Sequence, residues 1–223
     1  MNWLLFNPEL YFLIMGVVFL ALSMTDTKQQ NLYLAALAMA AVGVGVCLAS
    51  VYASGDLFYS TYRVDLFSQV FKVLLSLGFF LVICICNNLN GVDKRYHAEF
   101  YLLLTLTTLA MMMLVSCIHL LTVYVALELS SYSLYLLVSL RSPIDRGTRT
   151  ALNYFLIGAT ASAIMIFGLA LLYGATQTMH LSELMAKLPG MLDQPTVVIG
   201  MVMTLCGFFF KLAVFPFHFW APD

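Results

Sequence analysis

Three ionisable side chains, Lys72, Glu128 and Lys211, lie well inside long apolar stretches of the sequence. A charged residue at the centre of a bilayer costs roughly 2.5–3.5 kcal/mol on insertion scales, so such residues are rare and usually face a protein interior or a water-filled cavity. Where they occur, they typically carry protons or ions. The chemistry that these residues predict is therefore proton or ion movement.

Glu128 lies in the stretch "YVALELSSYSLYLLVSL". Burial favours the neutral carboxyl, whereas a nearby lysine favours the carboxylate. These opposed influences suit a group that must gain and lose a proton. The structural alternative is a carboxyl that stays neutral or bonds to Ser130, Ser131 or a neighbouring helix.

Lys211 lies in the stretch "CGFFFKLAVFPFHFWAPD", too deep for its side chain to reach water easily. Pro216 cannot donate a backbone hydrogen bond to Leu212, so the helix should break or kink one turn after Lys211. Broken helices inside membranes often form ion sites. His218 follows the break and is a candidate proton relay, although it could equally satisfy carbonyls that the break leaves free.

Lys72 belongs to a polar stripe whose members recur at three- and four-residue steps: Asp65, Ser68, Gln69, Lys72 and Ser76. The stripe could line a wet interface, and Lys72 is a second candidate relay. We favour a structural role, in which Lys72 pairs with Asp65 or with a neighbouring subunit.

The elements that hold these residues are membrane spans. The chain of 223 residues is 62% hydrophobic and only 9% charged, with a mean hydropathy of +0.95. Soluble domains average about 25% charged residues. A net charge of −1 also excludes a basic nucleic-acid surface. The composition predicts an all-α, polytopic bundle.

A membrane span needs about 20 apolar residues, which predicts about seven spans, the seventh discontinuous at Pro216. They lie near 4–24, 31–53, 65–87, 98–115, 118–140, 150–174 and 196–215. The segment "VSCIH" is expected to form a tight hairpin between the fourth and fifth spans, with His119 as an interfacial residue at the turn. Glu9 lies at the edge of the first apolar run.

Basic residues in the predicted loops indicate the orientation of the spans. Six lie on one side and two on the other: Lys28, Lys94, Arg95, Arg141, Arg146 and Arg149 against Arg63 and Lys187. The positive-inside rule then places the N-terminus outside and the "SPIDRGTR" loop in the cytoplasm. Glu128 would lie close to the midplane.

Two further segments are predicted to serve packing. The loop 176–196 should form a short interfacial helix, with apolar residues at helical spacing in Leu181, Leu184, Met185 and Leu188. In the sixth span, Gly158 and Ser162, like Ala159 and Ala163, are four residues apart and should allow close helix contact, with no chemistry implied.

The five cysteines match no zinc, iron–sulfur or redox spacing. We expect them to be small packing residues, and no metal site or haem or flavin motif is predicted.

Three stretches together resemble the antiporter-like membrane subunits of proton-pumping NADH:quinone oxidoreductase (respiratory complex I), in the form of its N subunits. They are "LELSSYSLYLLVSL", "ALNYFLIGATASAIMIFGLALLYGAT" and "FFKLAVFPFHFWAPD". The resemblance implies that Glu128 matches the fifth-span glutamate of the family and Lys211 its seventh-span lysine, a pair thought to pass a proton through a half-channel.

The resemblance also implies partners, cofactors and location. The chain would bind no cofactor itself, whereas NADH, FMN, iron–sulfur clusters and quinone would be held by other subunits. Its partners would be other membrane subunits and the lipid bilayer, with no nucleic acid. Its location would be the inner, cytoplasmic membrane.

Family members have about fourteen spans in two inverted five-span repeats. Residues 1–97 would correspond to an N-terminal three-span segment, and 98–223 to the first, incomplete part of the translocation repeat. We interpret the chain as an N-terminal portion of a longer subunit; a genuinely short paralogue is the alternative.

Two other functions remain open at this stage. One is a sodium/proton antiporter or an ion-pumping hydrogenase membrane subunit, which would share Glu128 and Lys211. The other is a truncated structural subunit that moves no ions, in which Gly158, Ser162 and the loop after the sixth span would be the important surfaces.

Overall fold

The computed structural model describes residues 3–25, 29–87, 89, 91–141, 144–215, 217 and 218. The elements in chain order are η1 (Trp3–Phe6), α1 (Asn7–Ser23), α2 (Gln29–Ala49), β1 (Gly55–Leu57), β2 (Tyr62–Val64), α3 (Leu66–Ile85), η2 (Lys94–Tyr96), α4 (His97–Leu114), α5 (Leu120–Ser139), α6 (Ile144–Thr176), α7 (Leu181–Lys187), η3 (Leu188–Met191) and α8 (Pro195–Lys211).

Helices dominate the architecture, which confirms the predicted all-α membrane bundle. Six helices of the described chain are long and apolar enough to cross a membrane, and α8 is a shorter apolar helix. The predicted turn at "VSCIH" is confirmed, because α4 ends at Leu114 and α5 begins at Leu120. The predicted short helix after the sixth span is confirmed as α7, with Leu184 buried, and its place at the membrane interface stays a prediction. The chain is thus a multi-pass membrane protein.

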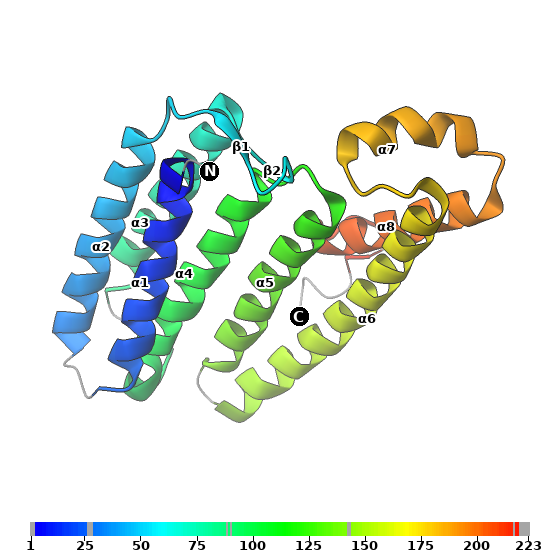
Figure 1. Ribbon diagram of the computed structural model, residues 1–223. Helices are drawn as coiled ribbons and strands as arrows, with labels where there is room; N and C mark the ends of the chain where they lie inside the picture. The colour runs from blue at the N-terminus through cyan, green and yellow to red at the C-terminus, as the bar shows by residue number, and fades with distance from the viewer. Residues whose placement is uncertain are drawn as a thin grey trace.

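Helices α1 to α4 form one group, and α5, α6 and α8 lie beside it (Figure 1). Helix α4 joins the two groups, since it packs against α1 on one side and α5 on the other. The core of the first group is aromatic and aliphatic, and it includes Phe12, Phe19, Phe79 and Tyr101. Phe12 and Phe79 meet edge to face at 5.5 Å between ring centroids, which ties α1 to α3.

A small antiparallel hairpin, β1–β2, covers one end of the helices (Figure 1). Its strands have only three residues each, too few for the hairpin to be predicted from the sequence. Residues 58–60 between the strands all have positive φ, from 52° to 60°, a conformation that is uncommon outside glycine. Ring contacts of 5.7 Å from Phe6 to Phe58 and to Tyr62 hold this turn in place.

Asp65 begins α3 and has a different role from the one predicted. Its side chain accepts a hydrogen bond from the Ser68 backbone N–H, and the Ser68 hydroxyl oxygen accepts one from the Asp65 N–H. This capping box satisfies free N–H groups of the first turn. The prediction that Lys72 pairs with Asp65 is wrong, because the Asp65 carboxylate is engaged at the helix start.

Candidate proton site

Glu128 and Lys211 are in contact in the described structure, although 82 residues lie between them in the sequence. Lys211 Nζ lies 3.1 Å from Glu128 Oε1, and the two side chains are only 13% and 8% exposed. The pair joins the middle of α5 to the last residue of α8. The two residues that the sequence pointed to are therefore brought together.

Two serine hydroxyls complete the contacts of this Glu128–Lys211 pair. Ser162 on α6 donates a hydrogen bond of 2.6 Å to Glu128 Oε1. Ser131 donates to the Leu127 carbonyl, so its oxygen can accept the 2.6 Å hydrogen bond from Lys211 Nζ. Each charged group thus has a hydroxyl partner with the matching role. The expectation that Ser162 serves packing alone is corrected: it bonds directly to the acid.

Helical spacing places Ser131 next to the acid, since residues three apart on a helix are neighbours on one face. The start of α5 is fixed by two backbone bonds to the segment before α7, from Leu120 N–H to the Met179 carbonyl and from Leu181 N–H to the Ile118 carbonyl. The depth of Glu128 in the bundle is therefore set by the α4–α5 turn and by α7 together.

Lys211 owes its position to the way in which α8 ends. Val214 N–H bonds to the Phe209 carbonyl and Ala213 N–H to the Phe210 carbonyl, the pattern of a Schellman motif. Ala213 takes the left-handed conformation at φ 50°, a place usually held by glycine. The lysine lies at the C-terminal, negative end of the helix dipole, where a cationic side chain interacts favourably with the last carbonyl groups.

The helix therefore stops at Lys211 itself, one turn earlier than predicted. Pro216 lies outside the described residues, so its part in the break stays a prediction. His218 is half-buried with its ring 5.7 Å from that of Phe215. Its role as a relay also stays a prediction.

Close backbone contact between α6 and α8 holds the lysine helix in place. A Cβ added at Gly168 would lie 2.6 Å from the Thr204 backbone nitrogen and 2.8 Å from the Gly200 carbonyl oxygen. One added at Gly207 would meet Met165 at 2.4 Å. The predicted close contact at Gly158 is confirmed, because a Cβ there would overlap the Tyr135 hydroxyl. The contacts of Gly168 and Gly207 were not predicted from the sequence.

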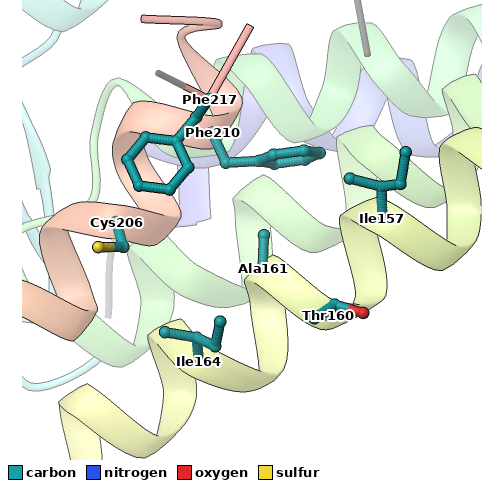
Figure 2. Close-up of a pocket in the computed structure, with 7 residues that line it drawn as sticks. All are labelled: Ile157, Thr160, Ala161, Ile164, Cys206, Phe210 and Phe217. Carbon is teal, nitrogen blue, oxygen red and sulfur yellow. The ribbon is translucent and has the colours of Figure 1, made fainter. Parts of the chain in front are cut away.

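An apolar groove of about 280 Å³ lies next to the pair, between α6 and the end of α8. Figure 2 shows Phe210 and Phe217 on one side of this groove and Ile157, Ala161 and Ile164 along α6 on the other. The lining includes Phe210, the residue before Lys211, and Ala161, the residue before Ser162, but none of the four polar residues of the site. The side chains that line the groove are mostly apolar and offer few ligands for an ion, so the Glu128–Lys211 pair remains the candidate site.

The energetics of the pair are close to balance. At 3.1 Å and an effective dielectric constant of about 20, the Coulombic attraction is about 5 kcal/mol. Removing each ion from water costs several kcal/mol. The attraction and the cost of removing the two ions from water are of the same order, so the contact by itself contributes little net stability.

Lys72, the other candidate relay, lies at a separate place. Its Nζ is 2.6 Å from Glu9 Oε1, and both side chains are fully buried. Tyr62 donates a hydrogen bond of 2.5 Å to the same oxygen. Glu9 was not predicted as a partner of Lys72, because it lies at the edge of an apolar run. The sequence signal that could have indicated it is a charged residue directly beside a long apolar segment.

A group of titratable residues also lies at the α4–α5 turn, where His119 and His180 form a backbone bridge. Their rings are 5.0 Å apart, edge to face. Burial, and then the neighbouring His180, lower the pKa of His119 below its ordinary value of 6.5. A hydrogen bond from Thr178 lowers the pKa of Glu183 nearby. His119 is thus neutral at neutral pH and serves the joint between two turns.

Comparison with known proteins identifies the family. Residues 117–223 match the model of the NADH:quinone oxidoreductase/Mrp antiporter transmembrane family. Over its full length the chain is 54% identical to NADH-quinone oxidoreductase subunit N 2 of Syntrophobacter fumaroxidans and covers 48% of that protein. The chain belongs to the antiporter-like subunit family. The matched region contains both Glu128 and Lys211.

Solved structures of the family agree with this fold. The chain matches a subunit of respiratory complex I from Thermus thermophilus with a TM-score of 0.77 and 32% identity, over 97% of this chain and 46% of the other. The Mrp complex of Dietzia sp. gives a TM-score of 0.76 at 20% identity, over 99% and 43% of the two chains, which shows the shared fold alone. The chain spans about half the length of the curated relatives it matches.

Proposed function

We propose that this chain is part of a membrane subunit of an NADH:quinone oxidoreductase, and that it moves protons across the membrane as quinone is reduced elsewhere in the complex. The observation that carries the proposal is the buried Glu128–Lys211 contact of 3.1 Å, with a serine hydroxyl on each charged group. The 54% identity to a subunit N supports the assignment to this complex.

In this proposal the chain performs no redox step. Glu128 takes up a proton and becomes a neutral carboxyl, and release of that proton restores the carboxylate beside Lys211. Ser162 holds the acid and Ser131 holds the amine through both states. NADH, FMN, iron–sulfur clusters and quinone belong to other subunits. Its partners are the other membrane subunits, its location is the inner membrane, and its N-terminus lies outside.

The test replaces the two charged residues in the native complex. Glu128→Gln and Lys211→Ala should each lower proton translocation per NADH oxidised by roughly tenfold or more, since a positioned acid–base group typically contributes 10²–10⁴-fold. Assembly of the complex should be largely intact. Asp193→Asn and Lys94→Ala are matched controls and should pump normally, because both side chains are exposed. Asp193 lies between helices, and Lys94 is the first residue of its apolar span.

Normal pumping by both pair variants would overturn the proposal. Translocation that depends on sodium and not on protons would favour the sodium/proton antiport alternative. If Glu128→Gln is silent while a bulky residue at Gly158 blocks assembly, the chain has a structural role. Proton translocation, its dependence on sodium and the assembly of the complex, measured on the same membrane preparations, distinguish the three outcomes.

A further inference from the structure

A second buried acid–lysine contact lies outside the region that matches the family model, and we call Glu9, Tyr62 and Lys72 the Glu9 cluster. Lys72 Nζ is 2.6 Å from Glu9 Oε1, with neither side chain exposed. The Tyr62 hydroxyl donates to the same oxygen, and the ammonium lies 5.3 Å from the centre of the Tyr62 ring. Residues from α1, β2 and α3 thus converge on one carboxylate oxygen.

Several buried polar atoms of the described residues around this cluster make no hydrogen bond. Among the described residues, Glu9 Oε2 and both side-chain polar atoms of Gln69, one turn before Lys72 on α3, are buried without a hydrogen-bond partner. Buried polar atoms of this kind are normally satisfied by ordered water. The free carboxylate oxygen is therefore the place where a proton or a water can bind.

Stability alone does not account for such a pair. A buried ion pair is often no more stabilising than a well-packed apolar pair of similar volume, and α1 and α3 are already joined by the Phe12–Phe79 contact. We propose that the Glu9 cluster is a second proton-exchange site, separate from the Glu128–Lys211 pair. Uptake of one proton converts the Glu9 carboxylate into a neutral carboxyl beside the Lys72 ammonium and raises the net charge by one; release reverses both changes.

The position of the cluster gives it a route to the aqueous end of the bundle. Glu9 lies in the first turn of α1, and Lys72 lies seven residues after the capping residue Asp65. Tyr62 points inward from β2, whereas the next residue, Arg63, is exposed, as the alternation of a strand requires. The Tyr62 hydroxyl is thus the group between the hairpin surface and the carboxylate.

The groups that face the cluster are few. Burial, and then the charge of Glu9, raise the pKa of Tyr62 far above its ordinary value, so the phenol stays protonated and donates a hydrogen bond to the carboxylate. The thiols of Cys47 on α2 and Cys117 in the α4–α5 turn lie within electrostatic reach of Lys72. Glu9 is thus the acid that exchanges, and Lys72 balances its charge.

The proposal rests on the proposed function for its physiological use, so the test has two readouts. In the purified native complex, infrared difference spectra after a pH step should show a carboxyl band that Glu9→Gln removes and Tyr62→Phe shifts. Proton translocation by Glu9→Gln and Lys72→Met should fall by about tenfold. The double variant Glu9→Gln/Lys72→Met, which leaves no unpaired charge, should assemble and remain impaired.

A double variant that assembles and pumps like the wild type would overturn the proposal and leave the pair as a structural contact. The absence of any carboxyl band assigned to Glu9 would overturn it as well. If Glu128→Gln also pumps normally, the proposed function has failed, and the infrared band alone decides whether Glu9 exchanges a proton. If Glu9→Gln does not assemble, the double variant and Tyr62→Phe supply both readouts.

Discussion

The close contact between α6 and α8 predicts how strongly the candidate proton site depends on the spacing of these helices. A Cβ at Gly168 would lie 2.6 Å from the Thr204 backbone nitrogen, whereas ordinary contact begins at 3.4 Å. Because the neighbour is backbone, Gly168→Ala must move the helices apart by about 0.8 Å, and overpacking of this kind typically costs about 1–3 kcal/mol.

The same movement reaches the charges at the end of α8. Lys211 Nζ is 3.1 Å from Glu128 Oε1 on α5, and a rigid shift of α8 relative to the other helices displaces the lysine from this contact. Misplacement by about 1 Å can cost roughly 10²-fold in a reaction that depends on positioning. We therefore expect Gly168→Ala to lower both the thermal stability of the subunit within the complex and its proton translocation.

The assay compares two alanine variants of one helix. Gly174 is also in α6, and a Cβ there meets nothing within 4 Å, so Gly174→Ala should stabilise the helix by about 0.5–1 kcal/mol and pump normally. Thermal unfolding and pumping in the same vesicles give both quantities. Equal stability and equal pumping of the two variants would refute the idea that backbone contact at Gly168 sets the position of Lys211.

Two further predictions concern local structure. Ala213→Gly should stabilise the end of α8 by about 1 kcal/mol, because glycine adopts the left-handed conformation at φ 50° without the strain of alanine. Ala163→Gly, on the exposed face of α6, should instead destabilise its helix by about 1 kcal/mol. Thermal unfolding measures both changes, and a change in stability of the same sign in the two variants would contradict this explanation. Since the pKa of folded His119 is below 6.5, the unfolded turn binds protons first, and stability is lost as pH falls through about 6.5. Hydrogen exchange of the Leu120 and Leu181 amides should therefore quicken between about pH 7.5 and about pH 5.5, after correction for intrinsic rates, and His119→Gln should remove this dependence; exchange that stays level in the wild type would count against it.

Hydropathy predicted the spans because each is a long apolar run, and the turn at "VSCIH" followed from a run too long for one helix. The pairing of Glu128 with Lys211 was accessible only through the family resemblance. Nothing in residue spacing specifies that α5 and the end of α8 meet. Ser162 was interpreted as a packing residue because a small side chain four residues from Gly158 has the same pattern in either role.

The partner of Lys72 shows a different limit. Asp65 is seven residues away, two turns along the same face, so it was a reasonable candidate from the sequence. The sequence also contains a capping pattern, since Ser68 follows Asp65 by three residues, and this local bond is the one that forms. Glu9 reaches Lys72 through the packing of α1 on its neighbours, which one-dimensional periodicity cannot predict.

The two acid–lysine contacts share one arrangement. In each, the lysine and a hydroxyl from another element converge on Oε1: Ser162 on Glu128, and Tyr62 on Glu9. In each, Oε2 is buried and has no hydrogen-bond partner among the described residues. An amine and a hydroxyl together stabilise the carboxylate through one oxygen, while the other oxygen stays able to accept a proton.

In the proposed exchange, this arrangement separates the group that balances the charge from the atom that would receive the proton. If the lysine occupied both oxygens, protonation would require the ion pair to break first. With one oxygen held and the other unpartnered, the carboxyl can change its protonation state while the helices stay in place. The two sites differ in access, since the Glu9 cluster is fully buried beneath Tyr62, whereas the side chains of the Glu128–Lys211 pair retain 8% and 13% exposure. Exchange at Glu9 should therefore be the slower of the two, because its proton must pass the Tyr62 hydroxyl.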